Sequence, residues 1–475
     1  MRTLRPYQAE LIDKARLKLK TNRSTLIVSA TGSGKTALSA YMLGSSAERG
    51  NRSIFTVHRQ ELLDQTYDAF MDACIVPGVI APGVEYDPDF PIHIAMLPTL
   101  IRRLDQIERP DLIVMDEAAH AVSPSWAKLT NHWSDSKLVG LTATPTRMDG
   151  KGLGDVFESM VTGPTVEWLI ENKFLSTYRA FTPSLPDTAG LHIEIGDYAR
   201  SELVGLMDKP TITGDAIGTY LKHAMGRKAI VFCASITHSQ SVRDAFKAAG
   251  ISCEHLDSGS GRTERKAVMD RYRAGEIDVL TNVDLFTEGL DVPGIEVMID
   301  LRPTMSLALH RQKIGRVLRY VDGKTALILD HAGNLMKHGL PDEEPVWSLA
   351  GVEKKSRKSV EKAMAIRQCM KCYAVSKATA SVCSCCGEEF KVKPRKIKVG
   401  DGELIELTPE QRKVLAIQRK IEQQQARTDE QLVALARKRG YKNPHGWAWR
   451  IQQVRGNRGN GYRSRRTPRG SFSFK

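Results

Sequence analysis

The stretch of this sequence best suited to chemistry is residues 30–36 (ATGSGKT), which follow an apolar run over residues 25–30 and precede a helical pattern. Glycines in such a loop let backbone N–H groups point at phosphates, Lys35 adds positive charge for the terminal phosphates, and the Thr36 hydroxyl can bind Mg²⁺. The general pattern has glycine where this chain has Ser29, and an ordinary turn between a strand and a helix is the alternative. The residues assigned to phosphate binding are Thr31, Gly32, Ser33, Gly34, Lys35 and Thr36.

A pair of acids supplies the second part of this chemistry. Asp116 and Glu117 follow the apolar run 111–115, and open α/β sheets bind ligands beyond the carboxyl ends of such strands. Asp116 can hold Mg²⁺, while Glu117 can orient and deprotonate an attacking water. A plain helix N-terminus is the alternative, but an upstream phosphate loop in the same sheet favours hydrolysis of a nucleoside triphosphate.

Two arginines near residue 316 complete the candidate active site. Arg316 and Arg319 fall in a predicted helix over residues 306–319, where a spacing of three places both side chains on one face. From that face both can reach across a cleft to the γ-phosphate and stabilise charge in the transition state. Such arginines are usually solvated, and these two gain specificity because Gln312 and Gly315 accompany them.

Five of the eight cysteines lie between residues 369 and 386, which favours a metal site over disulfides. The two knuckles can bring four thiolates into a tetrahedron around Zn²⁺, with Cys385 as the spare residue. A redox or disulfide role is the alternative. The predicted zinc ligands are Cys369, Cys372, Cys383 and Cys386.

The elements that must position these residues alternate between apolar strands and helical patterns. This alternation predicts an α/β fold with two parallel sheets, each covered by helices. The strands predicted for the first sheet are 25–30, 53–57, 92–96, 111–115 and 137–141, with helices over 59–70 and 124–133. The strands predicted for the second sheet are 228–233, 252–255, 278–281, 296–300 and 325–330, with helices over 212–224, 238–249, 262–274 and 306–319.

The positive charge of the chain is confined to its C-terminal part. Residues 391–475 contain 22 Lys plus Arg against 7 Asp plus Glu, whereas residues 1–390 contain 47 against 48. A basic block of this kind usually binds a polyanion, and nucleic acid is the leading candidate beside a merely solvated tail. Two capping boxes, at 408–411 and 428–431, predict helices within it, and the last segment, 455–475, has Arg-Gly pairs and no acid.

With all these motifs in order over residues 1–340, the chain resembles the superfamily 2 helicases of the DEAD/DEAH-like group, in the bacterial and phage branch related to type III restriction Res subunits and Rad25-like enzymes. Residues 30–36, 116–117, 141–147, 281–293 and 312–319 match motifs I, II, III, V and VI. Motif II departs from Asp-Glu-Ala-His because Ala119 stands in the fourth place and His120 follows it.

The resemblance also implies roles for residues that spacing alone does not identify. Arg5 and Gln8 would bind adenine, the backbone at Gly289 would approach the nucleotide closely, and Asp291 would contact the ribose. Arg59 and Thr99 would bind the backbone of one nucleic-acid strand. The catalytic residues would be Gln312, Lys35, Asp116, Glu117, Arg316 and Arg319. Gln8 suits adenine because its amide offers both a donor and an acceptor. A backbone grip needs no base-reading side chain and is therefore independent of sequence.

The resemblance over residues 1–340, together with composition, cysteine spacing and capping boxes in the rest of the chain, predicts the following domains: 1–165, an ATP-binding RecA-like domain; 166–210, a linker; 211–340, a second RecA-like domain; 341–366, a linker; 367–390, a zinc ribbon; 391–454, a basic helical region; and 455–475, a disordered Arg/Gly-rich tail.

The implied activity is ATP hydrolysis driving movement along DNA or its unwinding, with ATP, Mg²⁺ and Zn²⁺ as cofactors. DNA is favoured over RNA because Gln312 stands where DEAD-type RNA helicases usually have histidine. An RNA helicase and a duplex translocase without strand separation remain open. A non-catalytic nucleic-acid adaptor is disfavoured because Lys35, Thr36, Asp116, Glu117, Arg316 and Arg319 are all present. Implied partners are nucleic acid and proteins of replication or repair. We expect no membrane association and a location in the cytoplasm of a bacterial or phage-infected cell, because neither a signal peptide nor a membrane span is evident.

Overall fold

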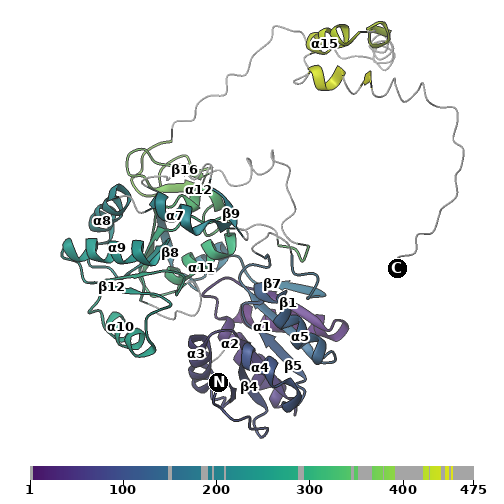
Figure 1. The fold of residues 1–475 in the computed structure, drawn as a ribbon, viewed down its shortest axis with the longest axis vertical. Helices are drawn as coiled ribbons and strands as arrows, with labels where there is room; N and C mark the ends of the chain where they lie inside the picture. Colours follow the sequence, from purple (N-terminus) through teal and green to yellow (C-terminus); the bar gives the residue numbers. More distant parts are fainter. Residues whose placement is uncertain are drawn as a thin grey trace, which may run out of the picture. The chain divides into compact units, whose positions relative to one another are not determined.

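In the computed structural model the chain forms two compact units, residues 1–392 and residues 393–475 (Figure 1). None of the described helices combines the length and the apolar character needed to cross a bilayer. The structure describes residues 4–147, 152–182, 191–194, 197–207, 210–286, 294–343, 347–350, 366–377, 379–390, 421–426, 428–439, 444–448 and 451–452.

The first unit contains a parallel seven-stranded sheet in the order β3-β4-β2-β5-β6-β1-β7 (Figure 1). Its central strands are apolar and buried along their whole length, as a parallel sheet covered on both faces requires. Successive residues of a strand face opposite layers. Thus Ile27 packs in the layer of α1–α3, whereas Leu26 and Val28 pack in the layer of α4 and α5. The bounds of the strands and helices are β1 Ser24–Val28, β2 Ser53–Val57, β3 Gly78–Ile80, β4 Ile92–Met96, β5 Leu112–Met115, β6 Lys137–Thr142, β7 Ser159–Thr162, α1 Pro6–Thr21, α2 Lys35–Ala47, α3 Gln60–Asp72, α4 Leu97–Arg102 and α5 Pro124–His132.

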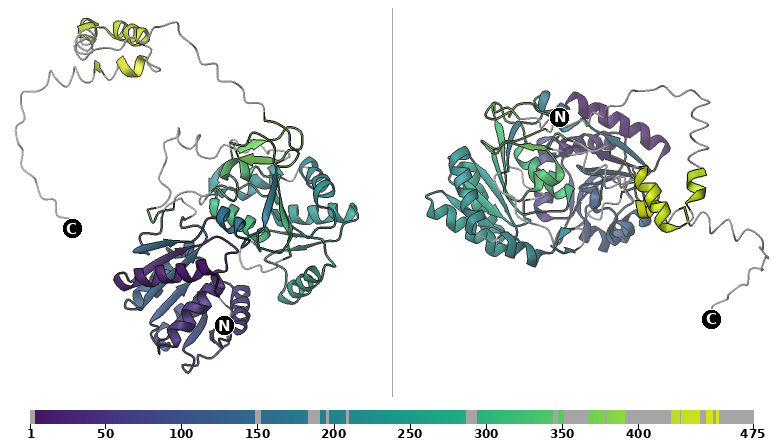
Figure 2. Two further views of the ribbon diagram at one scale, coloured as in Figure 1. Left: turned by 180° about the vertical axis from the view of Figure 1, so that it is seen from behind. Right: turned by 90° about the horizontal axis from the view of Figure 1, so that it is seen from above.

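A second parallel sheet follows, with six strands in the order β12-β13-β11-β14-β15-β8 (Figure 2). Two parallel α/β sheets in tandem confirm the predicted fold class. The bounds are β8 Thr177–Phe181, β11 Ala229–Cys233, β12 Cys253–Leu256, β13 Val279–Asn282, β14 Val297–Leu301, β15 Thr325–Asp330, α6 Val166–Glu171, α7 Arg200–Met207, α8 Pro210–Ala224, α9 Ile236–Ala248, α10 Arg262–Ala274, α11 Leu307–Val317 and α12 Asn334–His338, with a small pair of strands, β9 Ile193–Glu194 and β10 Asp197–Tyr198.

Two parts of this sheet differ from the expectations. Strand β8, which pairs in parallel with β15, lies within the segment 166–210 that the sequence indicates as a linker. Helix α11 ends at Val317, two residues short of Arg319, so the prediction of a helix through residue 319 is wrong. Leu318 caps the helix, and Arg319 then forms an isolated β-bridge with Leu175.

A small hairpin of β16 (Ile366–Gln368) and β17 (Val375–Lys377) carries the cysteine knuckles and packs on the second sheet. Phe181 at the end of β8 forms a β-bridge with Ala374 of the hairpin. Cys369 and Cys383 are buried in the same apolar layer as α8 and α9. The cysteine segment is therefore part of the first compact unit.

In the second unit the structure describes a helix, α15 (Asp429–Lys438), that begins as predicted. The Thr428 hydroxyl accepts a hydrogen bond from the Gln431 backbone, and the Gln431 side chain caps the Thr428 N–H in return. Trp447 packs against a small apolar cluster that includes Leu432 and Ala448, as expected for a small helical core. The predicted capping box at 408–411 and the predicted disordered segment 455–475 lie outside the described residues.

Candidate active site

The loop between β1 and α2 has the backbone conformation that phosphate binding requires. Gly32 and Gly34 both have φ of 85°, a left-handed conformation that glycine adopts without strain. Helix α2 begins directly after the loop, at Lys35, so its N-terminal N–H groups and positive dipole end face the space where phosphates would lie.

Gln8 and Tyr7 hold this loop from the side of α1. The Tyr7 hydroxyl donates a hydrogen bond to the Ser33 carbonyl at 2.6 Å, and Gln8 Nε2 donates to the same oxygen at 3.0 Å. Gln8 Oε1 accepts from the Arg5 backbone N–H at 3.0 Å, and the side chain is only 4% exposed. Both ends of the Gln8 amide are thus engaged within the protein, and its contact with adenine stays a prediction.

An aromatic wall beside Arg5 had no signal in the sequence. Phe174 lines the same cavity as the phosphate loop, and the Arg5 guanidinium lies 4.9 Å from the centre of its ring. Trp168 stacks on Phe174 with ring centres 5.7 Å apart. Phe174 comes from the segment between the two sheets, where neither periodicity nor a motif distinguishes it. A base bound beside Arg5 would meet this wall.

Lys35, Asp116 and Glu117 converge on a cavity of about 420 Å³ that both sheets line. Lys35 Nζ donates to the Ser29 carbonyl at 3.2 Å, and burial lowers the pKa of its ammonium group. Burial raises the pKa of Asp116 to about 6, with the neighbouring Glu117 charge acting in the same direction. A bound cation would offset both effects on the carboxylate.

The acidic pair sits at a sharp turn at the end of β5. Glu117 has φ of 47°, a conformation that non-glycine residues adopt rarely and that is enriched at functional sites. Asp116 and Thr36 line the same cavity and both offer the oxygen ligands that Mg²⁺ prefers, so the residues present fit this ion. When bound there, Mg²⁺ would neutralise charge on the phosphates.

The two arginines reach the cavity from the second sheet, although not from one helix face. Arg316 lies on α11, whereas Arg319 lies beyond its end, and both line the cavity with Lys35 and Glu117. Burial lowers the pKa of Arg319 to about 10. Arg316 and Arg319 thus line one cavity, as predicted. They do so because the chain turns at Leu318 and Arg319 pairs with Leu175, and not because the two residues share a helix face.

The two sheets touch through motif VI. Gln312 Nε2 on α11 donates to Glu117 Oε2 at 3.4 Å. One turn further along the helix, Gly315 packs against Thr31 of the phosphate loop so closely that a Cβ atom on Gly315 would lie 2.2 Å from Thr31 Cβ. Glycine at this position therefore allows the second sheet to approach the loop.

Gly315→Ala should lower the maximal ATP turnover by roughly tenfold or more, because a misplacement of about 1 Å at a reacting centre can cost 10²-fold. The control is Gly218→Ala in α8, where an added Cβ meets nothing within 4 Å. Steady-state turnover of the two variants at matched thermal stability tests this expectation. Equal turnover in both variants would contradict the close approach of Gly315 to the loop.

The predicted nucleic-acid contacts are placed unequally. Arg59, the residue before α3, lines a groove of about 770 Å³ with Ser235, Arg265 and Asp284 of the second sheet. Thr99 is only 6% exposed, so its side chain has little access to a ligand. Gly289 and Asp291 lie outside the described residues.

His120, the displaced histidine of motif II, lies against His58 with ring centres 5.8 Å apart. His58 directly follows β2, and His120 ends the short turn after Glu117. The displaced ring thus contacts the segment that leads to Arg59.

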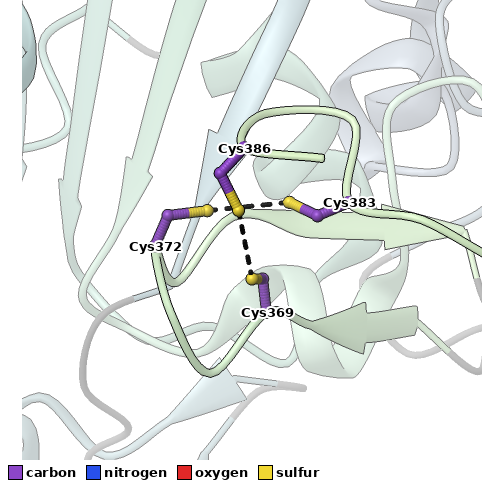
Figure 3. Close-up of side chains that lie close together, drawn as sticks. All are labelled: Cys369, Cys372, Cys383 and Cys386. Carbon is purple, nitrogen blue, oxygen red and sulfur yellow. Dashed lines mark hydrogen bonds between the residues drawn. The ribbon is translucent and has the colours of Figure 1, made fainter. Parts of the chain in front are cut away.

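The four predicted zinc ligands form one cluster (Figure 3). Their Sγ atoms all lie within 4.8 Å of one another, with separations of 3.6 Å for Cys369–Cys386 and Cys372–Cys383. Zinc bound by four thiolates at about 2.3 Å requires sulfur separations of about 3.8 Å, so the cluster fits this ion. Cys385 lies apart from the set, and its Sγ accepts from Arg179.

Elemental analysis of the purified protein should find one zinc ion per chain, and the double variant Cys369→Ser/Cys372→Ser should lose it. Metal binding is coupled to folding in such small segments, so loss of the metal should also unfold the two cysteine knuckles, while the packing of Ala374 on the second sheet holds the hairpin itself. Cys385→Ser is the matched control and should keep the metal. A natively purified protein without zinc would contradict the assignment.

The two sheets and the cavity between them suit a nucleoside triphosphate hydrolase, and comparison with known proteins identifies the class. Residues 2–147 match the family model described as "Type III restriction enzyme, res subunit", and residues 212–321 match "Helicase conserved C-terminal domain". The chain belongs to the superfamily 2 helicases and is an ATP hydrolase.

Relatives extend over most of the chain. A 51.5 kDa protein of a Lactococcus phage is 36% identical over 397 residues, covering 82% of this chain and 84% of its own. The candidate ATP-dependent helicase IRC3 of Saccharomyces cerevisiae is 29% identical over 340 residues, and the match spans about half of its length, 49%. A solved fragment of a candidate HsdR subunit of a type I restriction enzyme from Vibrio vulnificus shares the fold, with a TM-score of 0.56, 20% identity and coverage of 71% of this chain and 67% of that one.

Proposed function

We infer that this protein is a DNA motor, which hydrolyses ATP between its two sheets to move along DNA and to separate or remodel strands. The observation that carries this proposal is the single cavity lined by Lys35 and Glu117 from the first sheet and by Arg316 from the second. A nucleotide bound there touches both sheets. Its hydrolysis can therefore change how the sheets pack against each other.

The residues around the cavity support distinct roles in this reaction. Lys35 and the loop N–H groups would bind the terminal phosphates, while Thr36 and Asp116 would hold Mg²⁺. Glu117 would orient the attacking water and accept its proton, and Gln312, which reaches Glu117 Oε2, would keep that carboxylate in position. Arg316 and Arg319 would stabilise charge as the phosphoryl group transfers.

The groove beside Arg59 supports a path for the nucleic-acid backbone. It lies where the two sheets meet, because Arg59 belongs to the first sheet while Ser235 and Arg265 belong to the second. Its hydroxyl and guanidinium groups suit phosphate contacts that do not read sequence. The carboxylates of Glu61, Asp257 and Asp284 also line the groove, so a phosphate backbone would have to follow the arginine side. Ion pairs between α3 and α10, Arg262–Asp64 at 3.0 Å and Arg265–Glu61, also cross this junction, so movement of the sheets would rearrange the groove.

DNA is favoured over RNA as the track by two features. Gln312 begins motif VI, where RNA helicases of the DEAD type usually have histidine. In addition, residues 2–147 match the family model described as a restriction enzyme subunit. A DNA motor of this kind would bind proteins of DNA replication or repair.

The proposal is tested by measuring ATP turnover and strand separation together on single-stranded DNA, forked DNA, duplex DNA and RNA. We expect DNA to stimulate turnover and a fork to be unwound, with Lys35→Ala as the inactive control. Stimulation by RNA alone would overturn the assignment to DNA. Stimulation without unwinding would identify a duplex translocase, and no stimulation by any nucleic acid would overturn the motor.

Removing the basic C-terminal part should weaken DNA binding and flatten its salt dependence. Residues 391–475 hold 22 basic and 7 acidic residues. A chain that ends at Val392, the last residue of the first compact unit, keeps Lys391 and loses all the others. Every lysine or arginine that no longer neutralises a phosphate should reduce the slope of log affinity against log salt by roughly 0.9 on duplex DNA or 0.7 on single strands. Basal ATP turnover should persist, since the described cavity residues all precede Val321.

The measurement is a salt titration of DNA affinity for the full-length and shortened chains in the same nucleotide state. The decrease in affinity should be similar for different base sequences, because contacts to phosphates carry no sequence information. Equal slopes for the two chains would assign the basic charge to a protein partner or to solubility.

A further inference from the structure

A fully buried ion pair anchors α11, the helix that carries Arg316. Lys313 on α11 and Asp300 on β14 are both 0% exposed. Lys313 Nζ donates to Asp300 Oδ1 at 2.7 Å and Oδ2 at 2.6 Å, and to the Arg302 carbonyl at 3.1 Å. Burying two charges is expensive compared with packing apolar side chains of similar size, so the pair is weak evidence for a contribution to stability alone.

Asn334, at the start of α12, completes the hydrogen bonding of this pair. Its Nδ2 donates to Asp300 Oδ2 and to the Arg302 carbonyl, both at 2.8 Å, and its Oδ1 accepts from the Thr304 backbone at 2.9 Å. A buried network with its members satisfied in this way is rigid and admits one arrangement. The Lys313 ammonium group is therefore fixed relative to the end of β14.

The position of Lys313 on α11 gives this rigidity a consequence for the cavity. Gln312 and Arg316 are four residues apart and share one helix face, which meets Glu117 and the nucleotide cavity. Lys313 points about 100° away from Gln312 around the helix axis, into the second sheet. Its attachment to β14 thus opposes any rotation of α11 that would turn Gln312 and Arg316 away from Glu117.

We propose that Lys313 is a positioning residue for ATP hydrolysis, held by Asp300 and setting the rotation of α11 so that Gln312 and Arg316 face the nucleotide. It contacts neither nucleotide nor water and acts through these two residues. The inference rests on the proposed role of Arg316 at the transition state. Its rival is that the ion pair only holds the fold together.

The informative variant is the double substitution Lys313→Met/Asp300→Asn. The single substitution Lys313→Met leaves Asp300 buried without its partner and is expected to destabilise the protein, whereas removing both charges avoids this penalty. Asp300→Asn keeps a side-chain oxygen for the Arg302 N–H, which donates to Asp300 Oδ1 at 3.2 Å. It loses the oxygen that accepts from Asn334 Nδ2, so the control must also delete one buried hydrogen bond. Tyr272→Phe is the matched control, because it deletes another buried hydrogen bond of the second sheet, from Tyr272 Oη to the Ala229 carbonyl at 2.9 Å.

Three readouts are compared at equal folded fraction: affinity for a non-hydrolysable ATP analogue by calorimetry, KM for ATP, and kcat without nucleic acid. For the double variant we expect affinity and KM close to those of the natural protein and kcat lower by on the order of 10²-fold, the effect of a misplacement of about 1 Å. Tyr272→Phe should change none of the three.

A second comparison separates positioning from a purely structural role. Adding Arg316→Ala to the double variant should cost much less than Arg316→Ala costs in the natural protein, because the arginine is already misplaced. Additive losses, or a double variant with unchanged kcat, would overturn the proposal for Lys313 while leaving the active site intact. If Arg316→Ala in the natural protein leaves kcat unchanged, then Arg316 does not act in the transition state, and the proposal that Lys313 positions it is wrong as well.

Discussion

Lys35→Ala is expected to abolish ATP hydrolysis. The ammonium group enters the cavity from the first residue of α2 and lies near Asp116 and Glu117, where it would meet the terminal phosphates. No other lysine is among the described residues that line this cavity, and the two arginines that would act on the phosphoryl group, Arg316 and Arg319, approach it from the second sheet. The positive charge on the phosphate-loop side is therefore lost. Binding of ATP should also weaken, because the same contact exists in the ground state.

The measurement is ATP turnover under saturating nucleotide and DNA, with calorimetric titration of the ATP analogue alongside. Lys14→Ala is a matched control: Lys14 lies on α1, which packs on the same sheet, and its exposed side chain forms a surface ion pair with Glu10 at 2.6 Å. Near-normal turnover in Lys35→Ala would refute the assignment of the cavity as the ATP site.

Arg316→Ala should leave nucleotide binding nearly unchanged and lower turnover by on the order of 10³-fold. The reason is that an arginine acting across the cavity stabilises charge that appears mainly in the transition state. Arg316→Lys should recover only part of this turnover, because an ammonium group lacks the planar fork of donors.

Arg311→Ala serves as the control on the same helix. Arg311 Nη2 donates to the Glu343 carbonyl at 2.7 Å, and its guanidinium lies 5.4 Å from the centre of the Trp347 ring. It therefore reports the removal of a packed arginine from α11 outside the nucleotide cavity. If Arg316→Ala weakens binding and leaves turnover intact, Arg316 is a binding residue, and its proposed role is wrong.

Local sequence determined the parts of the site that depend on neighbouring residues only. A buried apolar strand, a glycine-bearing turn and a helix start are each encoded within about ten residues, so the phosphate loop and the strand end before Asp116 were predictable. The same holds for the helix start at Thr428 and for the convergence of Cys369 and Cys386, whose spacing allows one cluster.

Only the tertiary structure decided what depends on the meeting of the two sheets. Arg319 reaches the cavity because a bridge to Leu175 extends the chain past the end of α11, which no helical period could indicate. Phe174 and Gln8 line the cavity because the fold brings them next to residues that are distant in sequence, such as Ser33 beside Gln8. Position 315 requires glycine because Thr31 lies so close to it. From the sequence alone, a lysine such as Lys313 in an amphipathic helix is expected to face solvent, because its partner Asp300 cannot be identified. The partner of Lys313 lies 13 residues away on another element, so their burial together follows from the fold.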